Sequence, residues 1–134
     1  MTYDIEITDF APDARTSRTV VGTAEEAWIA SRTAQALDPC VLLVGRRADN
    51  VSQGDFHVWL TGDRASVRLD EHREWYAMDA SWVASTTAGE TWFRDSDGTP
   101  FPAQDAETVS RSQAFEALGH WLRTGEMLPS LTWA

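Results

Sequence analysis

The sequence predicts one α+β domain, residues 1–134, in which two helices pack on an antiparallel or mixed sheet of about six strands. Three observations lead to this prediction. Several segments alternate apolar and polar residues with the period of two that is typical of strands with one wet face. Two capping-box sequences precede stretches with apolar residues at helical spacing. A length of 134 residues with 43% apolar residues suits one compact core.

The first part of the chain is expected to form a strand, a loop and a helix. The segment 2–10, "TYDIEITDF" with one apolar residue in every two, predicts the strand. The segment 11–18 contains a proline and small polar residues, and we interpret it as a turn or loop. Thr23 and Glu26 form a capping box, which predicts a helix near 24–36. The "LDP" that follows should end this helix, because the residue before a proline is disfavoured in helical geometry.

The next part is expected to supply the centre of the sheet. The segment 40–45, "CVLLVG", is short and continuously apolar, which predicts a strand covered on both faces, with Cys40 as a buried and inert thiol. The segment 46–55 is rich in turn-forming residues. The segments 56–61 and 64–70 then alternate in phase around "GD", which predicts a hairpin.

The last part is expected to continue the antiparallel sheet and to end in a helix. The segments 81–86 and 90–95 each have the composition of a short strand. A second capping box begins at Ser110 and is followed by apolar residues on one helical face, with Gly125 placed to cap the end. The segment 130–133 is expected to return to the edge of the sheet.

Acidic residues outnumber basic residues by 21 to 11, which gives a net charge of −10. The excess is greatest between residues 70 and 107. A field of this sign repels phosphate backbones, so it argues against direct nucleic-acid binding and favours a partner with a cationic surface. No stretch approaches the roughly 20 apolar residues that span a bilayer, and the chain does not start like a signal peptide. We therefore expect no membrane partner and a cytoplasmic location.

The segment 69–82, "LDEHREWYAMDASW", combines carboxylates with aromatic rings. Among the seven tryptophans, Trp121 is assigned to a helix core, whereas Trp75, Trp82 and Trp92 border the acidic region. Tryptophan and tyrosine are enriched at the energetically dominant positions of interfaces, and carboxylates would pair with a basic protein. We therefore predict a partner-binding surface that consists of Asp70, Glu71, Glu74, Trp75, Tyr76, Asp79, Asp95 and Asp97.

The chain shows no motif for catalysis or for cofactor binding. Its three histidines lie in different predicted elements without ligand-pair spacing, and its one cysteine gives no C-x-x-C pair. There is no Gly-rich phosphate loop and no G-x-S-x-G elbow. We therefore expect no enzyme activity, no catalytic residue, no metal site and no cofactor. One alternative stays open, a small metal-dependent enzyme in which Asp70, His72 and Glu74 surround the ion.

The C-terminal quarter resembles the immunity proteins numbered one among bacterial polymorphic toxin systems, here called Imm-one. In that family an F-P turn precedes a helix of the pattern "A…AL…FL-x-T-G", followed by a proline and a terminal tryptophan. The matching residues are Phe101, Pro102, Ala114, Ala117, Leu118, Trp121, Leu122, Thr124, Gly125, Pro129 and Trp133. The order of the earlier elements is also similar. Trp121 departs from the pattern, because aliphatic residues or phenylalanine are usual there.

The resemblance implies an antitoxin that binds and neutralises a cognate secreted toxin, often a deaminase-fold enzyme that acts on nucleic acid. Such a toxin carries a basic cleft, and an acidic protein with aromatic anchors suits that cleft. The predicted function is therefore that of an immunity protein that occludes the active site of its toxin. A general acidic adaptor, or nucleic-acid mimic with several clients, is the other alternative to the metal-dependent enzyme.

Overall fold

A computed structural model describes residues 1–79 and 89–134 of the chain. Its elements run in the order β1 (Thr2–Asp9), β2 (Arg15–Val21), α1 (Ala24–Ser31), the 3-10 helix η1 (Arg32–Ala36), β3 (Cys40–Ala48), β4 (Val51–Thr61), β5 (Arg64–Glu71), β6 (Arg73–Met78), β7 (Glu90–Arg94), β8 (Pro100–Gln104), the 3-10 helix η2 (Asp105–Glu107), β9 (Val109–Ser110), α3 (Arg111–Thr124) and β10 (Thr132–Trp133).

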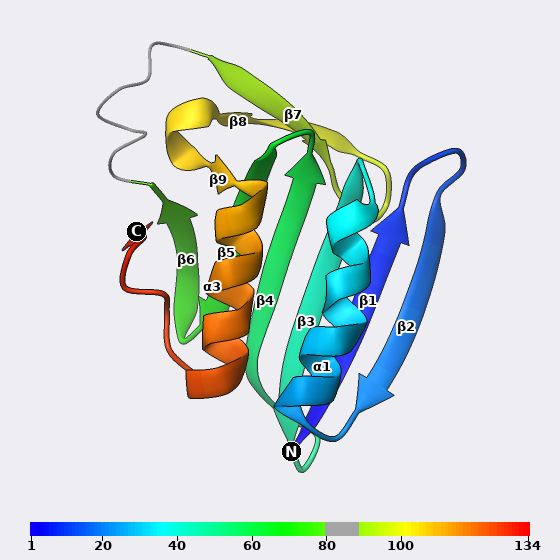
Figure 1. Cartoon of the computed structure of the whole chain (residues 1–134), viewed down its shortest axis with the longest axis vertical. Helices are drawn as coiled ribbons and strands as arrows, with labels where there is room; N and C mark the ends of the chain where they lie inside the picture. The colour runs from blue at the N-terminus through cyan, green and yellow to red at the C-terminus, as the bar shows by residue number, and fades with distance from the viewer. Residues whose placement is uncertain (80–88) are drawn as a thin grey trace.

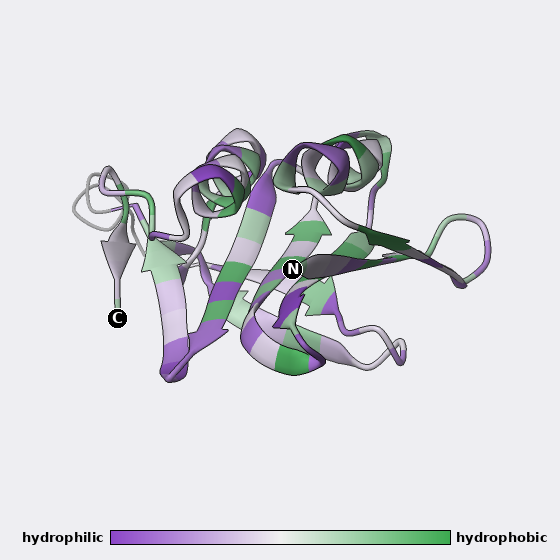
Figure 2. Cartoon of the chain, turned by 90° about the horizontal axis from the view of Figure 1, so that it is seen from below, coloured by the Kyte–Doolittle hydropathy of each residue, from purple (hydrophilic) through white to green (hydrophobic). Residues whose placement is uncertain are grey.

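One antiparallel sheet dominates the structure. Its strand order is β10-β6-β5-β4-β3-β1-β2, and β9 pairs with β5 outside this row. Both α1 and α3 lie on the same face of this sheet (Figures 1 and 2). Among the described residues, strands β7 and β8 pair only with each other and form a separate ribbon. The predicted α+β class with two helices on a sheet is confirmed, but the sheet has eight strands where about six were expected.

The strand boundaries differ from the predicted ones where pairing outweighs local composition. The segment 11–18 was predicted as a loop, but β2 begins at Arg15, because β2 pairs with β1 along its whole length. The turn-rich segment 46–55 is mostly strand, and only Asp49 and Asn50 form the turn, with φ of 50° and 64°. Such left-handed pairs suit tight hairpins, whose turn must match the twist of the strands. The predicted strand at 81–86 lies outside the described residues.

The main core lies between the sheet and the two helices. Apolar side chains alternate along each strand, so one face of the sheet meets α1 and α3. Trp121 and Leu118 on α3 are fully buried, as are Phe56 and Leu42 beneath them. Cys40 belongs to this core, as predicted, and burial raises the pKa of its thiol to about 12. In the described ranges no helix is long and apolar enough to cross a membrane.

The predicted helix at 24–36 is confirmed as α1 followed without a break by η1. The Thr23 hydroxyl accepts a hydrogen bond from the backbone N–H of Glu26, as the capping box predicts. The C-terminal helix also begins and ends as predicted, because Ser110 caps α3 and Gly125 follows it in the left-handed conformation with φ of 75°.

The capping box of α3 gives a direct test of its contribution to stability. The Ser110 hydroxyl accepts from the N–H of Gln113 at 3.1 Å, and the Gln113 side chain accepts from the N–H of Ser110 at 2.8 Å. Replacing Ser110 by alanine leaves the N–H of Gln113 without its acceptor, so we expect the free energy of unfolding to fall by about 1 kcal/mol in urea titrations. The exposed Ser130→Ala variant should stay within about 0.5 kcal/mol of wild type. Equal losses in the two variants would contradict this role of the cap.

Candidate protein-binding face

The face of the sheet opposite α1 and α3, here called the open face, carries part of the predicted binding surface. On β5 and β6, Arg68 lies directly opposite Tyr76 and Asp70 directly opposite Glu74. Residues that pair in this way point to the same side of an antiparallel sheet, and successive residues alternate. Asp70, Glu74 and Tyr76 therefore share the open face.

Two of the predicted residues lie on the other face. Trp75 pairs with the fully buried Leu69 and packs partly buried against the main core. Glu71 follows Asp70 and points to the helix side, where its carboxylate lies 3.5 Å from the guanidinium of Arg46. Alternation along a strand separates these two residues from Asp70 and Glu74, so the eight predicted residues do not form one continuous patch.

The geometry of the hairpin also bears on the metal-dependent alternative. His72 occupies the turn between β5 and β6 with a φ of 66°, so it does not continue the alternation that would place it beside Asp70 and Glu74. The Asp70 carboxylate is already bound by His57 and Arg68. Across residues 1–79 and 89–134 no group of three or more His, Cys, Asp or Glu side chains is placed to hold a metal ion.

His57 and Asp70 belong to a tight cluster on the open face. His57 Nε2 lies 3.0 Å from Asp70 Oδ2, and an Arg68 N–H donates to the same oxygen at 3.2 Å. The His57 ring stacks on Trp59 with centroids 5.3 Å apart, and the Arg68 guanidinium lies 5.4 Å from the Trp59 ring centre. Burial of the imidazole, aided by the charge of Arg68, lowers the pKa of His57 although Asp70 opposes the shift. The histidine is therefore neutral at pH 7.

This lowered pKa predicts a loss of stability in mild acid. The unfolded chain takes up a proton at His57 near the ordinary pKa of about 6.5, whereas the folded chain takes it up only at lower pH. Between those two values the unfolded state binds more protons, so the free energy of unfolding falls as the pH falls, by at most about 1.4 kcal/mol per pH unit. Urea titrations at pH 7.5 and 5.5 should show a smaller difference for His57→Gln than for wild type. His72→Asn, a change at the exposed turn, is the matched control. If His57→Gln lost as much free energy of unfolding between pH 7.5 and 5.5 as wild type does, the prediction would be contradicted.

The remaining predicted carboxylates have local partners. Asp95 and Asp97 lie in the turn between β7 and β8, where Asp95 Oδ1 accepts from the Trp59 indole N–H at 3.2 Å and Asp97 Oδ1 accepts from the N–H of Thr99 at 2.9 Å. The Thr99 backbone hydrogen bond lowers the pKa of Asp97. Asp79 Oδ2 accepts from the side chain of Gln113 at 2.8 Å. These contacts hold the β7–β8 ribbon on the open face and the end of β6 near α3.

Three carboxylates on the open face are neutralised by arginines of the same face. Asp4, Asp55 and Asp70 form ion pairs, and their partners are Arg18, Arg47 and Arg68 respectively. A different set of acids carries exposed charge without such partners. Glu74, Glu90 and Glu107 are exposed, and their carboxylates form no hydrogen bond or ion pair with the described part of the chain. These three side chains therefore carry negative charge that no local ion pair or hydrogen bond within the described residues offsets.

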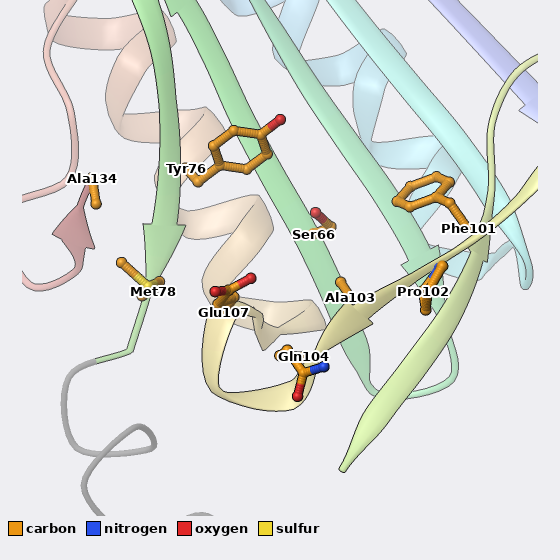
Figure 3. Close-up of a pocket in the computed structure, with 9 residues that line it drawn as sticks. All are labelled: Ser66, Tyr76, Met78, Phe101, Pro102, Ala103, Gln104, Glu107 and Ala134. Carbon is orange, nitrogen blue, oxygen red and sulfur yellow. The ribbon is translucent and has the colours of Figure 1, made fainter. Parts of the chain in front are cut away.

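The three unpaired carboxylates surround a groove of about 470 Å³ between β6 and β8. Figure 3 shows the residues that line it, which are Ser66, Tyr76, Met78, Phe101, Pro102, Ala103, Gln104, Glu107 and Ala134. Glu107 belongs to the lining, Glu90 pairs directly across from Gln104, and Glu74 lies two residues from Tyr76 on the same face of β6. The groove thus has largely apolar walls and an acidic rim.

Two exposed aromatic rings stand at this groove. Tyr76 forms part of its wall and is 39% exposed, and Trp92, which is 54% exposed, pairs across the ribbon with the groove residue Pro102. On the other side of the ribbon, Phe93 and Phe101 pack with Trp59 in a second apolar cluster, which fixes the ribbon to the open face. The ribbon that forms one side of the groove is therefore held by packing.

Sequence reasoning missed Ser66, Phe101 and Glu107 as site residues. They come from β5, β8 and η2, and only the folded ribbon brings them together. Exposed Trp92 was noted as a neighbour of the acidic region but was not included in the predicted surface.

No protein-family model and no curated protein matches this chain.

Proposed function

We propose that the chain is an immunity protein that binds a cognate secreted toxin and neutralises it in the cytoplasm. The toxin is a nucleic-acid-modifying enzyme such as a deaminase, and the immunity protein occludes its basic active-site cleft. The observation that carries this proposal is the grouping of unpaired Glu74, Glu90 and Glu107 with exposed Tyr76 and Trp92 around one groove. Unpaired carboxylates attract a cationic surface, and exposed rings supply the desolvated contacts that slow dissociation.

The energetic cost of binding favours these side chains over the paired ones. A carboxylate that already holds an arginine, as Asp70 holds Arg68, must lose that partner or share it before it can bind another protein. An exposed and unpaired carboxylate loses only its water. Charge complementarity of this kind raises the association rate, whereas well-packed aromatic anchors supply most of the affinity. The two properties together suit an inhibitor that must capture a toxin quickly and keep it bound.

Co-expression with the product of the neighbouring reading frame tests the proposal. A toxic product should arrest growth when expressed alone and should be harmless when this chain is present, and the two proteins should co-purify as a stable complex at moderate salt. Arrest that persists in the presence of this chain, with no complex recovered, would overturn the proposal.

The charge-reversal variant Glu74→Lys is expected to slow association with that toxin. The change removes an unpaired carboxylate from the groove rim and places a positive charge there, so we expect the association rate at low salt to fall about three- to tenfold and to depend less on ionic strength. Stopped-flow mixing at several salt concentrations measures both effects.

The matched control is Glu116→Lys, which makes the same charge change at an exposed position on α3, on the opposite side of the sheet. Both variants change the net charge from −10 by two units, to −8, because a negative charge is lost and a positive one gained. Equal slowing in both variants would show that total charge, and not this face, steers the encounter.

A further inference from the structure

We propose that the groove between β6 and β8 is a pocket for an arginine side chain of the bound protein. The assignment of this arginine to a toxin rests on the proposed function. The chemistry of the pocket follows from the residues that line it. Three features point to a cationic and planar ligand group: a hydroxyl that faces the groove and has no partner among the described residues, an unpaired carboxylate at the rim, and two aromatic walls held in place.

The hydroxyl of Ser66 lies at the floor of the groove (Figure 3). Ser66 is only 5% exposed, and its hydroxyl forms no hydrogen bond within residues 1–79 and 89–134. The residue is nearly buried, but it lines the groove, so its hydroxyl is open to a ligand there. The Ser66 oxygen can accept a hydrogen bond from a ligand N–H.

The carboxylate of Glu107 supplies the charge. Glu107 is exposed in η2, lines the groove and has no ion pair with the described residues. The side-chain carbonyl of Gln104, also in the lining, adds a second acceptor. The polar groups that face this groove are therefore able to accept several hydrogen bonds, which fits a guanidinium with its five N–H donors.

The walls favour a planar cation. Tyr76 is fixed by backbone hydrogen bonds with Ala134 of 2.8 and 3.0 Å, and its side chain is hydrogen-bonded to Arg68. Phe101 is fixed by an edge-to-face contact with Trp59, with the two ring centroids 5.7 Å apart. Rings held before binding lose little freedom when a ligand arrives. A guanidinium stacks on such rings and binds a carboxylate through two parallel N–H groups, whereas an ammonium is compact and strongly hydrated, so the pocket should prefer arginine to lysine.

Titration of the isolated protein with N-acetyl-arginine amide, followed by backbone amide NMR, tests the pocket without any protein partner. We expect saturable shifts at millimolar ligand that centre on Ser66, Tyr76 and Glu107, a weaker response to N-acetyl-lysine amide, and none to the neutral isostere N-acetyl-citrulline amide. Glu107→Gln should weaken arginine binding at least about fivefold, because it removes the charge of the acceptor. Ser66→Ala should weaken it by a smaller factor, and Glu116→Gln should leave it unchanged.

The two proposals fail in different ways. Shifts that are absent, that spread over the whole surface, or that are equal for citrulline would overturn the arginine pocket. If the complex with the toxin forms but its affinity is unchanged in Glu107→Gln, the pocket is likewise overturned while the proposed function stands. Selective arginine binding in a chain that rescues no toxic neighbour would support the pocket and overturn the proposed function.

Discussion

Replacing Trp121 by alanine is expected to lower the free energy of unfolding by about 3–5 kcal/mol, the largest loss that we predict for a single side chain. The ring is fully buried near the C-terminal end of α3, and its centroid lies 5.4 Å from that of Phe56. The Arg46 guanidinium lies over the ring, 4.9 Å from its centre. Truncation leaves a cavity between the helix and β4 that the packed surroundings can fill only in part. Urea unfolding followed by circular dichroism measures the loss.

Two variants separate this packing role from a general effect of losing an indole. Trp92→Ala removes a ring that is 54% exposed and should change stability by no more than about 0.5 kcal/mol. Trp121→Phe keeps an aromatic ring against Phe56 and Arg46, so its loss of free energy of unfolding should be less than half of the loss in Trp121→Ala. A loss below about 1 kcal/mol in Trp121→Ala would show that α3 is not anchored to the sheet by this ring.

Replacing Tyr76 by alanine is expected to weaken the complex with the toxin by about 2 kcal/mol or more, which is roughly 30-fold in the dissociation constant. Tyr76 is an exposed ring in a fixed position, beside the unpaired Glu74 and in the wall of the groove. Rigid aromatic residues of this kind dominate the energy of many interfaces because they bury a large area at little entropic cost. Isothermal titration calorimetry with the purified toxin measures the change.

The control for Tyr76→Ala is Tyr76→Phe, which keeps the ring and loses only the hydroxyl that meets Arg68. Its affinity should stay within about fivefold of wild type, because the ring that would pack against the toxin is kept. Urea unfolding of both variants shows whether the fold is intact, since an exposed side chain should contribute little to it. An affinity change below threefold in Tyr76→Ala, with the fold intact, would remove this ring from the interface.

The helices were predictable from sequence because their determinants are local. The N-cap at Thr23, the capping box at Ser110 and the cap at Gly125 each lie within a few residues of the helix end that they stabilise. The strand count was too low because β2 is exposed along nearly its whole length and carries no buried alternation, and because β9 is only two residues long. Such strands are defined by the partner they pair with, which local composition does not encode.

Only the part of the candidate site that depends on the alternation of side chains along a strand was predictable from sequence. Period-two spacing placed Glu74 and Tyr76 on one face, and it failed at His72, whose positive φ forms the turn. Which carboxylates are neutralised depends in part on neighbours far apart in sequence: Asp4 meets Arg18 across 14 residues, and Glu71 meets Arg46 from another strand. The groove itself depends on the β7–β8 ribbon folding back over the sheet, so its lining could not be read from any one segment.

The burial of Cys40 makes the natural thiol silent toward alkylating reagents at neutral pH, because the reactive thiolate is suppressed when the pKa is about 12. A single exposed cysteine, for example from Ser130→Cys, can therefore carry a maleimide fluorophore with no background labelling. Single-molecule fluorescence experiments can therefore use such a variant without replacing Cys40.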